Sequence, residues 1–265
     1  MRRNFISLLT FLFFAIAGLQ AQSYTFQHSS LPCLNKKFTI VAHIFRDSLG
    51  APGVTEDAIK MAVEGMNPFF APICASFEIC EFRYHDNWEH DFLEDMGVES
   101  AQIATEYHAD FRINMYFVSG FTDPLGHCGF ATVNGISQAT SSFIFIRKDC
   151  ITTRVFTHEM GHFFSLLHTF EGNGNELVNS DNCTTAGDGL CDTPADPFVD
   201  GDPQSDYVTG ECLFISPKTD ANGEFYNPDL GNIMSYYECG GLCGFTWEQL
   251  NKMAQAYLTS GVKFW

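Results

Sequence analysis

The stretch that decides the fold is His158-Glu159-Met160-Gly161-His162-Phe163-Phe164-Ser165-Leu166-Leu167-His168. Residues four apart in an α-helix lie on one face, about 6 Å apart along the axis, so His158 and His162 can bind one metal ion together. Glu159 is rotated by about 100° around the helix and lies beside that ion, where it can address a water molecule. The stretch therefore predicts a helix that carries a metal site.

The third histidine sets where this helix ends. His168 comes ten residues after His158, and a straight helix would carry it too far along the axis. We expect the helix to end near Ser165 and the chain to turn back, which makes His168 the third ligand. Three protein ligands leave a fourth position for water, as is typical of catalytic rather than structural zinc sites. A solvated helix with two incidental histidines is the alternative, and the third histidine at this offset argues against it.

Towards the N-terminus, apolar runs alternate with helical stripes. Runs of β-branched and aromatic residues predict strands, and apolar positions three and four apart predict helices. Thr55 is a suitable N-cap for the first helix. The expected elements are strands at 38–45, 77–84, 111–118 and 143–146, and helices at 55–70, 98–108 and from 153 onwards.

The sequence changes character beyond the third histidine. Residues 169–244 are rich in Gly, Asn, Asp, Pro and Cys and show little periodicity. This composition indicates a half that is dominated by loops and held by disulfides and ions. The segment Thr246-Trp-Glu-Gln249 fits a capping box and predicts a closing helix.

Length and charge bound the fold class and the partners. The chain has 265 residues, 45% of them hydrophobic, which suffices for one substantial core. We expect an α+β fold in a single domain over 22–265, with an α/β-like upper half (about 36–165) and an irregular lower half (about 166–265). The net charge of −18 fits poorly with nucleic acid, whose phosphates need clustered Lys and Arg.

The first 21 residues have the features of a secretory signal peptide. Arg2 and Arg3 precede an almost wholly apolar run over 5–19, and Ala21 suits cleavage, with Ala17 as an earlier site. An uncleaved anchor is the alternative, but the run is short for a membrane span of about 20 residues. Removing the two positive charges changes the net charge from −18 to −20. We expect a secreted, periplasmic or extracellular protein without stable membrane insertion.

The cysteines support export. All ten follow the signal segment, and an even number in an exported protein indicates disulfides, five at most. None has the Cys-x-x-Cys spacing of a structural zinc ribbon.

The histidine stretch resembles the motif of the metzincin clan of zinc metallopeptidases, His-Glu-x-x-His-x-x-Gly-x-x-His. Metzincins also have a tight turn with a buried methionine beneath the metal, and Asn232-Ile-Met-Ser-Tyr236 matches it. Together with His168-Thr-Phe170, the segment Asp188-Gly-Leu-Cys-Asp-Thr-Pro-Ala195 narrows the resemblance to the pappalysin family. The resemblance covers about residues 150–250, with a weaker match at the strand over 38–45.

The resemblance implies roles for the matching residues. Tyr236 would lie near the zinc and stabilise the oxyanion, and Met234 would form an apolar floor rather than a ligand. Asp188, the carbonyl of Cys191 and Thr193 match a calcium-binding loop of the family, for which a solvated acidic turn is the alternative. The family has two disulfides around this loop, and their four cysteines would come from five candidates, which leaves the pairing open: Cys183, Cys191, Cys212, Cys239 and Cys243.

The sequence departs from the family pattern in three places. Ser165 replaces the Gly of the turn, where a left-handed backbone costs Ser roughly 1 kcal/mol. About 16 residues separate Ala21 from the strand at 38–45, which leaves little room for a pro-segment. Cys33 is a conceivable latency thiolate for the zinc, but we expect it in a disulfide. We expect no appended sorting or binding domain after Trp265.

These observations predict a secreted zinc-dependent endopeptidase acting on proteins or peptides, with Glu159 as the general base. The alternatives are a catalytically degenerate zinc- or calcium-binding interaction module, a zinc hydrolase of non-peptide amides or esters, and a disulfide-bonded adhesion module. In related enzymes the segment after Met234 lines the specificity pocket. Glu238 is its only charge here, and it would favour Arg or Lys after the scissile bond if it faced the pocket rather than solvent.

Overall fold

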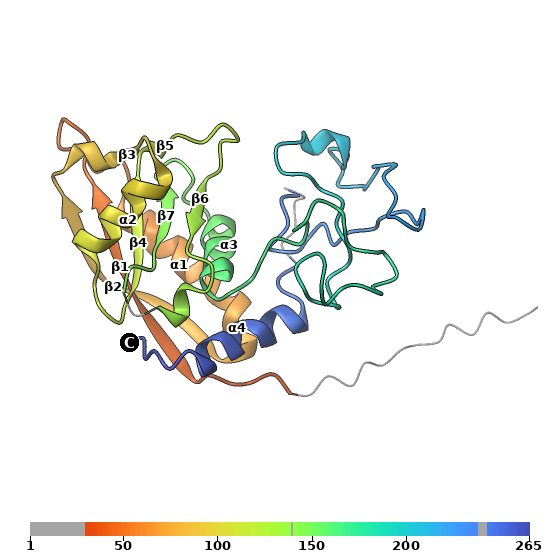
Figure 1. Ribbon diagram of the computed structural model, residues 1–265. Helices are drawn as coiled ribbons and strands as arrows, with labels where there is room; N and C mark the ends of the chain where they lie inside the picture. Colours follow the sequence, from red (N-terminus) through yellow and green to blue (C-terminus); the bar gives the residue numbers. More distant parts are fainter. Residues whose placement is uncertain (1–29, 139, 238–242) are drawn as a thin grey trace, which may run out of the picture.

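The computed structural model describes residues 30–138, 140–237 and 243–265. The expected signal peptide over 1–21, Glu238 and Cys239 lie outside the described residues. Figure 1 shows a sheet with flanking helices on one side of the molecule and a lobe built of loops on the other.

A five-stranded sheet organises the upper half. Its strand order is β2-β1-β4-β7-β6, and all neighbours are parallel except the β6–β7 pair at the edge. A short parallel pair, β3 with β5, lies apart from this sheet. The strands are β1 (Lys36–Phe45), β2 (Ala75–His85), β3 (Phe92–Leu93), β4 (Ile113–Val118), β5 (Gly120–Phe121), β6 (Gly129–Ala131) and β7 (Ile144–Arg147).

Four α-helices and four 3-10 turns complete the described elements. The helices are α1 (Glu56–Phe70), α2 (Met96–Tyr107), α3 (Thr153–Phe163) and α4 (Trp247–Thr259). The 3-10 turns are η1 (Ala71–Ile73), η2 (Trp88–Asp91), η3 (Gly135–Ser137) and η4 (Gln204–Asp206). The predicted α+β class is confirmed, and the predicted elements correspond to β1, β2, β4, β7 and the four helices.

Alternation along the strands divides the core into two layers. In β1, Ile40, Ala42 and Ile44 face one apolar cluster, which includes buried residues of α1, α3 and α4. Phe45 belongs to a second cluster on the opposite face, together with Ile103 of α2. Because both faces of the sheet are covered, its central strands are almost wholly apolar, as expected for parallel strands buried on two sides.

Local capping explains where the helices begin. The Thr55 hydroxyl accepts a hydrogen bond from the N–H of Ala58 at the start of α1. Thr246 and Gln249 form the reciprocal bonds of the predicted capping box at the start of α4. Each cap satisfies amides that have no partner within their helix, so these predictions of helix starts from short motifs are confirmed.

The lower half is built almost entirely of loops. Between α3 and α4 the described chain contains one 3-10 turn, η4, and no α-helix or named strand. Its apolar cluster is small and consists of Phe170, Phe198, Tyr207, Val208 and Tyr237. This matches the expected irregular half.

Three disulfides join described residues, and Cys33 lies in one of them, as predicted. Since Cys239 lies outside the described residues, a second disulfide around the acidic loop stays a prediction. Cys33–Cys74 and Cys128–Cys150 lie in the upper half, and within the described residues the lower half holds only Cys183–Cys191. Cys33 is therefore bonded to Cys74 and carries no latency thiolate. Cys212 and Cys243 form no disulfide with another described residue.

The closing helix α4, which the predicted division assigns to the lower half of the chain, packs against the upper half. Leu250, Met253 and Ala254 join the larger apolar cluster beneath the sheet. After α4, Trp265 exchanges backbone hydrogen bonds with the upper half, accepting from Thr39 and donating to Phe111. In the part of the chain that is described, no helix has the length and apolarity needed to cross a membrane.

Candidate active site

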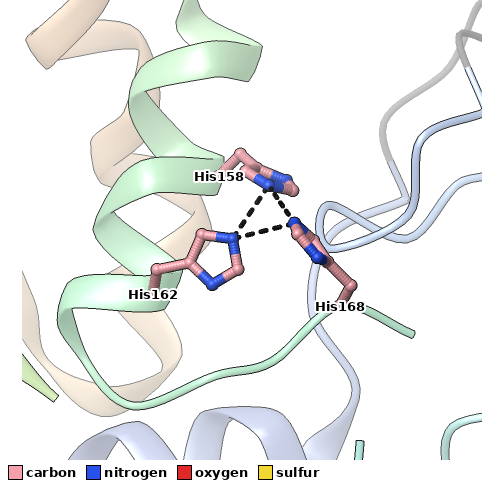
Figure 2. Close-up of side chains that lie close together, drawn as sticks. All are labelled: His158, His162 and His168. Atoms are coloured by element: carbon pink, nitrogen blue, oxygen red, sulfur yellow. Dashed lines mark hydrogen bonds between the residues drawn. The ribbon is translucent and has the colours of Figure 1, made fainter. Parts of the chain in front are cut away.

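Helix α3 carries two of the three predicted metal ligands. The Thr152 hydroxyl caps it by accepting from the N–H of Val155, and every residue from Phe156 to Phe163 is buried. A helix this enclosed gives its side chains fixed positions. His158 and His162, four residues apart, both point to the side where the lower half begins (Figure 2).

The helix ends where the sequence predicted. Its last residue is Phe163, and Ser165 has a left-handed backbone with φ of +82°. The N–H of Leu166 bonds back to the carbonyl of Gly161 at 3.0 Å, which closes the turn. The chain then returns along the helix and brings His168 to the other two histidines (Figure 2). The strained position predicted at Ser165 is confirmed.

The three imidazoles converge through their Nε2 atoms. Nε2 of His158 lies 3.1 Å from that of His162 and 3.2 Å from that of His168, and the remaining pair is 3.0 Å apart. Nitrogens bound to a tetrahedral zinc at about 2.0–2.1 Å are about 3.3 Å from one another. The donor set and its spacing therefore fit a zinc ion.

Backbone carbonyls fix the tautomers of the two helical ligands. Nδ1 of His158 lies 2.8 Å from the carbonyl of Ile233, and Nδ1 of His162 lies 2.8 Å from that of Leu166. A carbonyl only accepts, so each Nδ1 carries the proton and each Nε2 presents a lone pair to the space between the rings. This is the arrangement in which histidines ligate metals.

Burial keeps all three rings in the neutral form that binds metal. Loss of solvation, together with a smaller effect of the neighbouring His162, lowers the pKa of His158 to about 3. The pKa values of His162 and His168 are also lowered, chiefly by burial. Neutral imidazoles with converging lone pairs repel one another, and a cation between them removes that repulsion.

Glu159 lies next to the edge of the sheet. It is 5% exposed, and its Oε2 has no hydrogen-bond partner among the described residues. Burial alone raises its pKa to about 8. A Cβ on Gly129 of β6 would lie 3.0 Å from Oε1 and 2.8 Å from the carbonyl of Phe145. Glycine at this position therefore lets the edge strand pass close to the carboxylate.

A tight turn around Met234 supports the histidines from below. The side chain of Asn232 accepts from the N–H of Met234 and bonds to Gln249 of α4. A Cβ on Gly161 would lie 2.5 Å from the Met234 sulfur. The glycine inside the histidine motif thus makes room for the methionine side chain.

Tyr236 lies beside the three converging histidines. Its ring centroid is 4.7 Å from that of His168 and 5.6 Å from that of His158. Burial and nearby carboxylates raise its pKa well above the usual value, so its hydroxyl stays protonated and can donate a hydrogen bond.

A cleft of about 410 Å³ opens at these residues. Residues of α3, the segment before β6, the 198–204 segment and Tyr236 line it. At its rim His127 lies between two carboxylates, with Nδ1 2.9 Å from Asp123 and Nε2 3.2 Å from Asp200. The Asp200 contact bridges the upper and lower halves.

The acidic loop of the lower half contains buried oxygen atoms without partners. Asp188 and Thr193 are both 1% exposed, and Asp188 Oδ2 and Glu176 Oε1 have no hydrogen-bond partner in the described chain. Burial, together with a smaller effect of the nearby Asp188, raises the pKa of Glu176 to about 8. Burial likewise raises the pKa of Asp188 to about 6. The sequence reasoning missed Glu176, because it lies outside the loop motif.

Further side chains at the site were missed by sequence reasoning. Arg154 lies four residues before His158 and lines the cleft, so helical spacing alone offered a signal. Asp196 accepts hydrogen bonds from Thr169 and Tyr237, at 2.7 Å each. It directly follows the acidic motif that ends at Ala195. His127 was missed as well: Asp123 lies only four residues before it, but its second partner, Asp200, lies 73 residues away.

Comparisons with known proteins agree with the geometry. The model of the pregnancy-associated plasma protein-A family matches residues 141–258, and a reprolysin-like model of metallopeptidase family M12B matches residues 58–169. The structure of mature mirolysin from Tannerella forsythia, in complex with a cleaved peptide, aligns with a TM-score of 0.59 at 14% identity over 89% of this chain and 99% of that one. The predicted resemblance to metzincin-type metallopeptidases is confirmed. At this identity, the likeness to mirolysin concerns the fold alone.

Two curated relatives are named extracellular metalloproteases. That of Colletotrichum graminicola is 28% identical over 159 residues, which cover 54% of this chain and 51% of the relative. That of Podospora anserina is 26% identical over 207 residues, which cover 69% and 65%. The matches thus span between half and two thirds of the relatives' length.

Proposed function

We propose that this chain is a secreted zinc-dependent endopeptidase in which His158, His162 and His168 hold the zinc. The observation that carries the proposal is the convergence of three neutral imidazoles, 3.0–3.2 Å apart, on one side of a buried helix. A structural role for these histidines would leave their lone pairs opposed. When bound, zinc supplies Lewis acidity that activates water and polarises a carbonyl group.

Glu159 is the general base of the proposed reaction. Its unpartnered Oε2 accepts a proton from the attacking water and later passes that proton to the leaving amine nitrogen. Tyr236 donates a hydrogen bond to the oxygen on which negative charge develops. The two groups lie on opposite halves of the molecule, and both line the cleft.

Secretion and a protein or peptide substrate belong to the same proposal. The signal-like start of the chain and relatives named extracellular metalloproteases support export. Mirolysin holds a cleaved peptide in its complex, which suggests the substrate class by analogy. Sequencing the N-terminus of the exported protein tests the predicted cleavage after Ala21, and an unprocessed start would contradict it.

Metal analysis and a cleavage assay test the central proposal together. The purified mature chain should contain about one zinc per molecule and should cleave casein or a peptide library. A chelator should abolish cleavage, and zinc should restore it. Absence of zinc after refolding with the metal would exclude the proposed site. Zinc without cleavage would instead favour a degenerate binding module, and turnover restricted to simple esters would favour a non-peptide hydrolase.

A cation site in the lower half is a second part of the proposal. We infer that Asp188, Thr193 and the carbonyl of Cys191 bind calcium, with Glu176 as a further ligand. Buried carboxylate oxygens without partners are costly unless a cation pairs with them, and oxygen donors are what calcium prefers. The ammonium group of Lys252 donates to the backbone carbonyl of Asp188.

A further inference from the structure

The segment that carries Tyr236 has no regular secondary structure, yet its carbonyls are held by side chains. Arg154 Nη2 donates to the carbonyl of Ser235 at 2.9 Å and to that of Tyr237 at 3.0 Å. Gln204 donates to the intervening carbonyl of Tyr236 at 2.7 Å. Three successive carbonyls thus depend on two side chains for their position.

Arg154 belongs to the same rigid element as the metal ligands. It lies in the first turn of α3, four residues before His158, so both side chains leave the same face of the helix. Its guanidinium stays charged and offers several donors in a fixed plane. Through it, the helix that fixes two histidines also fixes the backbone on both sides of Tyr236.

We propose that Arg154 is a positioning residue for Tyr236, setting the distance between its hydroxyl and the reacting carbonyl. This inference rests on the role of Tyr236 in the proposed function. A small displacement of a group that acts in the transition state lowers the rate of the chemical step far more than it weakens substrate binding.

The ring of Tyr236 has its own contacts, which separate positioning from folding. It packs against Phe170 and Phe198, with centroids 4.8 and 5.9 Å away. The neighbouring Tyr237 is anchored independently through its hydroxyl on Asp196. Without Arg154 these contacts should keep the segment packed in the lower half. Its position relative to α3 should become less fixed.

A double-mutant cycle tests the inference in the zinc-loaded enzyme. Arg154→Gln keeps a polar side chain but is too short to hold both carbonyls. We expect its kcat to fall about tenfold with KM changed less than about threefold. In the Tyr236→Phe background the same change should cost less than about twofold, because the hydroxyl it positions is already gone. The inference is wrong if the two substitutions lower kcat by independent factors that multiply in the double mutant. It is also wrong if Arg154→Gln raises KM alone, which would indicate direct contact with the substrate.

Two further variants guard against a trivial loss of folding. Arg154→Lys keeps the charge and much of the reach, so its kcat should lie between those of wild type and Arg154→Gln. Arg46→Gln is the matched control. Arg46 pairs with Asp86 on the surface and lies outside the cleft lining, so its loss should leave kcat unchanged. A drop in kcat for Arg46→Gln equal to that of Arg154→Gln would mean that the effect is not specific.

Amide exchange provides a readout that needs no activity. In the metal-free protein, Arg154→Gln should accelerate exchange about tenfold in a peptide over 233–237, where the Ser235 N–H bonds to Asn232. Peptides from α1 should not change. Unchanged exchange over 233–237 would overturn the inference whatever the enzyme does. If exchange is accelerated but the chain has no peptidase activity, the proposed function is refuted. The conclusion that Arg154 holds the backbone around Tyr236 still stands.

Discussion

The upper and lower halves of this molecule are stabilised by different means. The upper half buries two apolar clusters on the faces of a five-stranded sheet. The lower half buries a cluster of five residues and relies on side chains that bond to backbone, on the Cys183–Cys191 disulfide and on buried carboxylates. Apolar burial stabilises in proportion to area at nearly any pH, whereas buried carboxylates depend on partners and ions. The two halves should therefore respond differently to mutation, ions and acid.

The cleft of the proposed active site is lined by residues of both halves. Replacing a proposed catalytic group there should therefore change activity far more than the stability of either half. Glu159→Ala on α3 should reduce cleavage by about 10²–10⁴-fold, the usual contribution of a positioned proton-transfer group. Zinc content and the melting temperature should stay close to those of wild type. Steady-state kinetics and metal analysis measure both.

Glu64→Ala is the matched control for this substitution, because Glu64 is an exposed glutamate of α1. It should cleave like wild type. Activity of Glu159→Ala within a factor of about three of wild type would mean that another group takes the proton.

The lower half should be the part that responds to calcium. At fixed zinc, calcium at about 100 times its dissociation constant should stabilise the protein by about 2.7 kcal/mol. Asp188→Asn should remove most of this gain, and Asp181→Asn, an exposed neighbour, should keep it. Thermal melts with and without calcium, combined with limited proteolysis over 169–237, give the comparison. Equal calcium responses of wild type and Asp188→Asn would argue against the site.

Acid should weaken the upper half through His43, which lies buried on the second face of the sheet. Burial lowers its pKa to about 3. The groups facing it are His85, Asn114, Arg83 and His108.

Because the unfolded chain protonates near pH 6.5 and the folded one only near 3, stability contributed by neutral His43 is complete above pH 6.5 and is lost as pH falls between these values. His43→Gln should lower the slope of stability against pH by about 1.4 kcal/mol per unit in that window. Denaturant unfolding at pH 7 and pH 5 measures it. Identical slopes for the two proteins would show that His43 does not titrate on unfolding.

The smallest expected effect lies at the junction of the halves. Ser165→Gly should stabilise the protein by up to about 1 kcal/mol, because φ of +82° is strained for Ser and free for Gly. Ser48→Gly, at an exposed position without positive φ, should give no gain. Equilibrium unfolding of both variants measures the difference, and a loss of stability in Ser165→Gly would mean that the serine side chain compensates for its backbone.

Sequence patterns predicted the upper half well because its signals are local. A run of β-branched and aromatic residues predicted β1, and the caps at Thr55 and Thr246 marked two helix starts. The edge strand β6 was missed. It has three residues, begins with Gly129 and is defined by pairing with β7 rather than by its own composition.

The prediction of the site was limited by contacts between residues that lie far apart in the sequence. The spacing of His158, His162 and His168 was sufficient to predict that they meet, since all three lie within eleven residues. Arg154 and Asp196 act on partners 81 and 41 residues away, respectively. The disulfide pairing and the packing of α4 on the upper core were equally undetermined, because composition does not say which distant surfaces meet.

The sequence by itself determined the alternation of strands and helices, the helix that carries two histidines, its end near Ser165 and the return of His168. Each follows from periodicity, capping or backbone strain within a few residues. Only the tertiary structure decided that Gly161 makes room for Met234, that Ile233 orients His158, and that Arg154 holds the backbone around Tyr236. These contacts join α3 to a segment about 75 residues further along the chain, and what brings the two together is packing of the folded molecule rather than any local preference of the backbone.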